Sequence, residues 1–199
     1  MHNKKPLLIV TLFAISLLLL SCDSVTQKKT LIVRNINDGE SLTADIEDWW
    51  TIGSGEDEEE FSEIPSYTVP IEVSYFVGYS GLPSPISFAQ IDEYTVTFKD
   101  VTPIEQGGTP ITFTHRISGG CSFLVEADPE GGNSEEGIIT VLTREWIILY
   151  FGELEDGKTL LATITLKGID TGSEAEVEGK GSLLINIADF EDDPRTKGQ

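Results

Sequence analysis

The chain has 199 residues, with 34 acidic and 13 basic side chains and a formal net charge of −21. So acidic a surface is repelled by nucleic acid and by anionic lipid, which excludes partners that are bound through clusters of Lys and Arg. Hydrophobic residues make up 39% of the chain, which is enough for the core of one folded domain rather than a disordered acidic segment. Cations, sugars and basic protein surfaces remain as partners.

The first 21 residues have the organisation of a bacterial signal peptide. Two lysines precede an apolar run over 6–20, which at helical rise reaches about 22 Å and is too short to span a bilayer. Leu19, Ser21 and Cys22 resemble the lipobox of bacterial lipoproteins. This resemblance implies that Cys22 becomes the lipidated first residue of the mature chain, because its thiolate can take a diacylglycerol group.

We therefore expect the mature protein in the cell envelope, held to a bacterial membrane by acyl chains that each contribute about 0.8 kcal/mol per buried methylene. Cleavage removes two lysines and no acid, so it makes the protein more acidic. Lys28 and Lys29 fall in the expected tether, where they either meet lipid phosphates or are only solvated. The alternative is a secretory signal that leaves Cys22 as a free thiol. The predicted organisation is a signal peptide (1–21), a lipidated tether (22–30), a β-sandwich domain (31–190) and a polar tail (191–199).

Apolar residues alternate with a period of two along the rest of the chain, and a helical period does not recur, so the sequence predicts strands. The first opens at Leu31, and the second alternates from Leu42 to Ile46 and continues into Trp49 and Trp50. On this parity Trp50 faces the core and Trp49 faces solvent. An exposed Trp beside carboxylates can stack on a sugar ring, so Trp49 is a candidate ligand-binding residue. The alternatives are a protein contact or cover by the loop that follows.

Further strands are predicted over 71–79, 86–101, 111–117 and 123–126. The apolar run over 138–151 is interpreted as two strands or one bent strand. His115 shares the parity of its apolar neighbours, which predicts a half-buried structural residue in the sheet. Cys121 follows two glycines and is expected as a small buried residue where a turn enters a strand. With Cys22 lipidated, Cys121 has no disulfide partner.

The strongest local prediction is a closing hairpin. Alternation from Leu160 to Leu166 leads into a turn around Asp170, whose carboxylate can bond backbone amides of the turn, and a return strand runs to Ile187. Gly179 and Gly181 fall inside the return strand and predict a bulge or bend.

Eight or so short strands separated by turn signals indicate an all-β fold, an antiparallel β-sandwich of about 7–9 strands. The segments 162–172 and 181–190, together with 94–98, are similar to the final hairpin and a central strand of immunoglobulin-like domains in bacterial lipoproteins of unassigned function. The resemblance implies an immunoglobulin-like sandwich and brings no catalytic motif with it.

Three acidic groups stand at 56–60, 128–136 and 189–193, and we expect repulsion from anionic lipid to orient them away from the membrane. Oxygen-rich loops suit calcium, although none of these has the spacing of a known calcium loop, and solvated, self-repelling loops are the alternative. The second group is the better candidate because its glycines let the chain fold back. Its predicted calcium ligands are Asp128, Glu130, Asn133, Glu135 and Glu136.

The sequence holds no nucleophile elbow, no phosphate-binding loop and no pair of histidines at metal spacing. The main hypothesis is therefore a non-enzymatic, lipid-anchored envelope protein with an immunoglobulin-like structural or binding module. It needs no cofactor. The first alternative is a calcium-assisted, carbohydrate-binding lipoprotein that uses Trp49 and the acidic loops, and the second is an unrecognised hydrolase.

Overall fold

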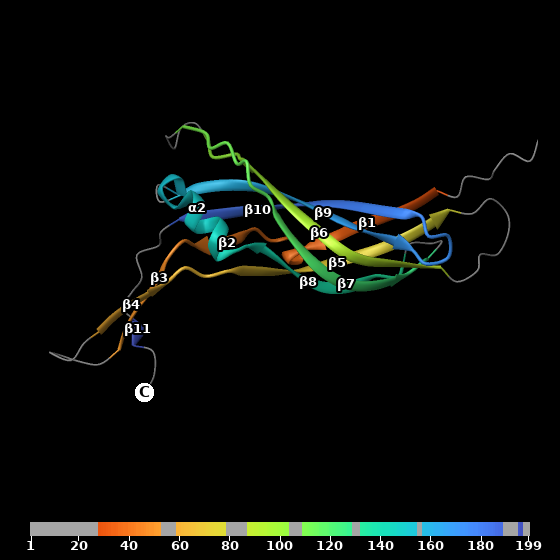
Figure 1. Cartoon of the computed structure of the whole chain (residues 1–199), viewed down its shortest axis with the longest axis horizontal. Helices are drawn as coiled ribbons and strands as arrows, with labels where there is room; N and C mark the ends of the chain where they lie inside the picture. The colour runs from red at the N-terminus through yellow and green to blue at the C-terminus, as the bar shows by residue number, and fades with distance from the viewer. Residues whose placement is uncertain are drawn as a thin grey trace, which may run out of the picture.

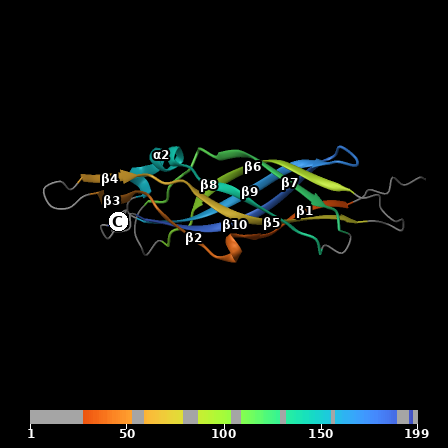
Figure 2. The same ribbon diagram turned by 90° about the horizontal axis from the view of Figure 1, so that it is seen from below.

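The chain folds as two β-sheets packed face to face, shown in Figure 1 and, turned by 90°, in Figure 2. This computed structural model describes residues 28–52, 59–78, 87–103, 109–128, 132–154, 157–188 and 195–196. One sheet has three strands, in the order β1 (Lys28–Ile36), β5 (Tyr67–Gly78) and β8 (Glu135–Leu142). The other has five, in the order β2 (Leu42–Asp45), β10 (Glu176–Ala188), β9 (Lys158–Asp170), β6 (Phe88–Asp100) and β7 (Ile117–Glu126).

The predicted antiparallel β-sandwich is confirmed. Among the strands described in these two sheets, every neighbouring pair is antiparallel except β2 and β10. The order β1-β5-β8 corresponds to strands A-B-E of an immunoglobulin-like sandwich, and β10-β9-β6 corresponds to strands G-F-C. A short 3-10 turn, η1 (Asn37–Gly39), joins β1 to β2, and all three of its residues have positive φ. The first part of the chain therefore crosses from one sheet to the other.

The core lies between the sheets and is filled from alternate positions of the strands. The predicted closing hairpin is confirmed, with a register that runs from Glu176↔Ile169 to Ile187↔Lys158. The predicted inward parity of 71–79 is confirmed as far as Val77, and Tyr79 lies outside the described residues. The hairpin contributes these residues to the core: Leu160, Ala162, Ile164, Leu166, Val177, Leu183, Ile185 and Ile187.

The prediction of strands throughout 138–151 is wrong, because an α-helix, α2 (Arg144–Leu154), follows β8. Thr143 caps this helix by accepting a hydrogen bond on Oγ1 from the backbone N–H of Trp146 at 3.2 Å. Ile148 and Leu149 are half exposed although they are apolar, and they hide the helical period in the sequence. The residues that α2 buries are Trp146, Ile147, Tyr150 and Leu154.

The segment before β7 also differs from the prediction. Residues 109–116 form no strand, and β7 continues from Ile117 through its two glycines to Glu126. Cys121 is therefore in the middle of a strand, and His115 is exposed in the irregular segment instead of half-buried in the sheet. Gly119 is needed in β7 because a Cβ there would lie 2.5 Å from the hydroxyl of Tyr94.

A third, smaller sheet extends from the end of the sandwich opposite the start of β1 (Figure 1). It consists of β3 (Asp48–Ile52), β4 (Glu59–Glu63) and β11 (Arg195–Thr196), with β3 in the middle. The predicted second strand is therefore two strands, because the chain leaves the sandwich after Asp45. Part of the first acidic group belongs to β4, and residues 53–58 lie outside the described residues.

Gly179 and Gly181 do not form the predicted bulge, since the pairing of β10 with β9 is regular through both positions. They allow β1 to approach β10 instead. A Cβ on Gly181 would lie 2.6 Å from Cδ1 of Ile36 and 2.7 Å from Cγ1 of Val33, and one on Gly179 would lie 3.0 Å from Cγ of Leu31. The side chains of β1 therefore pack directly on the backbone of β10.

Candidate functional site

A buried carboxylate joins the two sheets at the end of the sandwich where β1 begins. Asp170 is the last residue of β9, and its side chain is 1% exposed. Lys29 of β1 places its Nζ 2.8 Å from Oδ1, and the hydroxyl of Tyr75 in β5 donates to Oδ2 at 2.6 Å. The Ser87 hydroxyl also donates to Oδ2, and the backbone N–H of Ser173 donates to Oδ1 at 2.7 Å. We call these five residues the inter-sheet clamp.

In the clamp Asp170 is ionised, and both of its carboxylate oxygens accept hydrogen bonds. Burial by itself raises the pKa of Asp170, but the hydrogen bonds from Lys29, Ser87 and Tyr75 outweigh it and hold that pKa well below its usual value. The expected bond to the turn amides is confirmed by Ser173. Sequence analysis missed the other partners, and it placed Lys29 in the tether, whereas its ammonium is engaged inside the sandwich and neither meets lipid nor is merely solvated.

At the opposite end of the sandwich, α2 is fixed to residues 114 and 115 through the hydroxyl of its own Tyr150. The backbone N–H groups of Thr114 and His115 donate to it at 3.0 and 3.2 Å, and Nδ1 of His115 lies 3.2 Å away. The indole N–H of Trp146 donates to the carbonyl of His115 at 3.2 Å. Burial raises the pKa of Tyr150, but the hydrogen bonds from Thr114 and His115 outweigh it and lower that pKa. His115 therefore helps to dock the helix.

The proposed calcium ligands are placed as follows. Oδ2 of Asp128 accepts hydrogen bonds from the backbone N–H groups of Gly132 and Asn133, at 2.6 and 2.8 Å. Glu135 and Glu136 are successive residues of β8, and Glu130 lies outside the described residues. Within the ranges described, no group of three or more His, Cys, Asp or Glu residues could hold a metal ion. The calcium site stays a prediction.

The acidic groups lie at both ends of the sandwich. The backbone N–H of Asp128 donates to the carbonyl of Tyr75 at 3.0 Å, which puts the second group beside the start of β1. The first group adjoins β4, at the far end in Figure 1, and residues 189–193 lie outside the described residues. The first two groups therefore cannot both face away from a tether that enters at β1.

Trp49 belongs to β3, where its backbone pairs with Ser62 of β4. The side chains of Trp49 and Trp50 lie outside the described residues. Their predicted orientations and the sugar contact of Trp49 stay predictions.

The thiol of Cys121 is half-buried near two acids on β6. Burial raises its pKa to about 11, with smaller contributions from Asp92 and Glu93. In a Cys22→Ser chain, where Cys121 is the only thiol, we expect iodoacetamide at pH 8 to alkylate Cys121 about a hundredfold more slowly than in the same chain unfolded in urea, because the thiolate is the reactive form. Equal rates in the folded and unfolded chains would show that the thiol is not protected.

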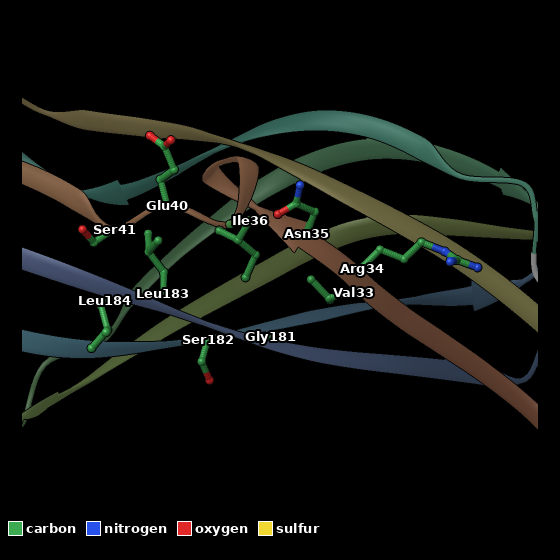
Figure 3. Close-up of a pocket in the computed structure, with 11 residues that line it drawn as sticks. Val33, Arg34, Asn35, Ile36, Glu40, Ser41, Gly181, Ser182, Leu183 and Leu184 are labelled. Atoms are coloured by element: carbon green, nitrogen blue, oxygen red, sulfur yellow. The ribbon is translucent and has the colours of Figure 1, made fainter.

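A groove with a volume of about 340 Å³ lies where the first part of the chain crosses between the sheets (Figure 3). The end of β1, residues 39–41 and residues 181–184 of β10 line it. β2 pairs with β10 only from Leu42↔Ile185 to Asp45↔Ala188, so residues 39–41 run beside the groove without pairing to β10. Sequence analysis missed this groove. Its local signals in the sequence were Asn37-Asp38-Gly39, which form the positive-φ turn, and the two glycines of β10.

The groove is neutral although the chain as a whole is strongly acidic. Its charged lining residues are Arg34 of β1 and Glu40, one of each sign (Figure 3). Arg34 is held by a hydrogen bond from its Nε to the hydroxyl of Ser74. The uncharged part of the lining consists of apolar residues, the amide residue Asn35, the serines Ser41 and Ser182, and two glycines.

No protein-family model matches the sequence, and no curated protein matches it. Of the helices in the described ranges, none has the length and the apolar character needed to cross a membrane.

Proposed function

We propose that this protein is a bacterial envelope lipoprotein, anchored through Cys22, that presents an immunoglobulin-like sandwich as a non-enzymatic binding module. The way the chain enters the sandwich is the observation that carries this proposal. β1 begins at Lys28, so residues 23–27 alone separate it from Cys22, and they span at most about 20 Å. The clamp between Lys29 and Asp170 then fixes β1 to the second sheet at its second residue.

A tether of this kind would hold the clamp end of the sandwich close to the membrane. α2 and the third sheet lie at the opposite end and would face away from the bilayer (Figure 1). The second acidic group, beside the start of β1, would then face the lipid surface. Repulsion there is offset by the anchor, because acyl chains hold the protein without any help from charge.

The use of the polar groups supports binding rather than chemistry. Hydrogen bonds hold the pKa of Asp170 and that of Tyr150 below their usual values, and both groups hold parts of the fold together. The neutral groove between β1 and β10 offers apolar side chains, hydroxyls and backbone groups, which recognise a ligand by shape and hydrogen bonds.

Replacing Cys22 by Ser tests the anchor. We expect the wild-type protein in the membrane fraction of the bacterial cell and extractable by detergent. The Cys22→Ser protein is expected in the soluble envelope fraction, because no acyl chain is attached to it. Cys121→Ser is the matched control and should fractionate like the wild type. If the wild-type protein is itself in the soluble envelope fraction, as expected for a cleaved secretory signal that leaves Cys22 as a free thiol, the lipid anchor is wrong.

A further inference from the structure

We infer that the open edge of β10 in the groove is a docking site for an extended peptide segment of a partner protein, which adds to the sheet as a further strand. This inference names the class of ligand for the binding module and rests on that proposed function. It depends on which backbone groups face the groove, on their lack of a partner strand, and on the charge around them.

The direction of the backbone groups follows from one hydrogen bond. The carbonyl of Ala188 accepts from the N–H of Ile46, at 3.3 Å, on the edge of β10 that β2 occupies. The N–H and C=O of a strand residue point to the same edge, and this edge alternates along the strand. Because β10 keeps a regular register with β9, Leu184, Ser182 and Lys180 present their N–H and C=O groups to the same edge as Ala188.

This edge has no partner strand over the groove. β2 begins at Leu42, opposite Ile185, so it does not reach Ser182 or Lys180. β1 passes close by but pairs with β5. It approaches Gly181 with the side chains of Val33 and Ile36, and Gly179 with the side chain and the carbonyl oxygen of Leu31. Among the strands that the structure describes, none pairs with β10 at Ser182 or Lys180 on the edge opposite β9. An unpaired edge of this kind is a template for a strand from another chain.

The groove also provides a place for the side chains of such a strand. The partly buried Val33 and the outer parts of the buried side chains of Ile36 and Leu183 form the apolar lining beside the open edge. Gly181 lets Val33 and Ile36 lie directly on β10. Alternate side chains of an added strand would point toward this surface, and the others toward solvent. The groove therefore favours a segment in which small apolar residues alternate with polar ones.

Charge narrows the segment further. The chain carries a net charge of −21, but the groove has Arg34 at one end and Glu40 at the other (Figure 3). A segment that is neutral overall, with an acid near Arg34 and a base near Glu40, matches these charges. A strongly acidic segment is repelled by the surrounding surface.

A selection from random octapeptides displayed on phage tests the site on the full chain. We expect enriched peptides to bind the Ser182→Pro protein at least tenfold more weakly than the wild type, because proline removes the N–H that faces the groove. This N–H points away from β9, so the substitution removes no hydrogen bond between the two strands. Ser182→Ala, which keeps the N–H, should bind like the wild type. Failure to enrich peptides, or equal binding to the wild type and Ser182→Pro, would contradict the inference.

The selected peptides give a second test that needs no altered protein. Methylating the backbone nitrogens on the peptide edge that faces β10 should weaken binding to the wild type at least tenfold, whereas methylating the opposite edge should change it less than twofold. Equal losses from both patterns would exclude strand addition. The Cys22→Ser protein should bind the peptides like the wild type, so a failure of the anchor is distinguishable from a failure of the docking site.

Discussion

Replacing Asp170 by Asn is expected to lower the free energy of unfolding by about 3 kcal/mol, measured by urea denaturation at pH 7. The substitution keeps the size of the side chain and removes its charge. The ammonium of Lys29, whose side chain is 15% exposed, then has no counter-ion at 2.8 Å. The hydroxyls of Tyr75 and Ser87 lose a charged acceptor that also ties one sheet to the other.

The exposed ion pair between Lys180 and Glu178 is the matched control. Its atoms are also 2.8 Å apart, but its side chains are 61% and 47% exposed, so Lys180→Met should leave the urea midpoint unchanged. If Lys180→Met lowered the free energy of unfolding as much as Asp170→Asn does, burial of the clamp would not be the reason for its contribution to stability.

The pH dependence of the Asp170→Asn effect has a definite sign. The pKa of Asp170 is held below its usual value in the folded chain, so the unfolded chain takes up the proton first as the pH falls below about 4. The stability that the clamp supplies is present above that pH. It is lost below it, at up to about 1.4 kcal/mol per pH unit. The difference in free energy of unfolding between the wild type and Asp170→Asn should therefore become smaller from pH 7 to pH 3. A difference that does not change with pH would show that Asp170 does not stabilise the fold as an ionised group.

Replacing Gly168 by Ala is expected to cost about 3 kcal/mol or to prevent folding, measured by the same urea denaturation. Gly168 of β9 pairs with Ile91 of β6, next to the bulge in β6. A Cβ at this position would lie 2.0 Å from the backbone oxygen of Gln90. Because backbone cannot rotate away as a side chain can, the two central strands of the sheet would have to separate.

Gly152→Ala makes the same chemical change where there is room for it. Gly152 lies in α2 with no atom within 4 Å of an added Cβ, and alanine favours a helix over glycine by about 1 kcal/mol. We therefore expect Gly152→Ala to raise the urea midpoint and Gly168→Ala to lower it. Equal effects of the two substitutions would show that the close approach of β6 and β9 is not limiting.

The strands were predictable where one face of a strand meets the core and the other meets water. In the closing hairpin, apolar residues occupy every second position from Leu160 to Leu166, and Leu161 is the only apolar residue on the other parity. The turn carries Asp170 and a glycine, so pairing and parity follow from the local pattern. The helix α2 was not predictable in the same way. Its buried residues do have helical spacing, but Ile148 and Leu149 on its exposed side are apolar as well. The result is a continuous apolar run, in which the spacing of apolar residues does not distinguish a helix from a strand.

The clamp and the groove depend on contacts between distant parts of the chain. Asp170 has a local signal as a turn residue, but Lys29 and Tyr75 reach it only once the sheets are stacked. The open edge of β10 depends on where β2 begins, which is set by the positive-φ turn at 37–39. The glycines of β10 were visible in the sequence, but a bulge and a close approach give the same local pattern.

The mass of the N-terminal peptide of the protein purified from bacterial membranes tests the proposed anchor most directly. The account predicts a mature chain that begins at Cys22, with a diacylglyceryl group on its sulfur, and no chain that retains residues 1–21. A mature chain that begins elsewhere, or one in which Cys22 carries an unmodified thiol, would contradict the account.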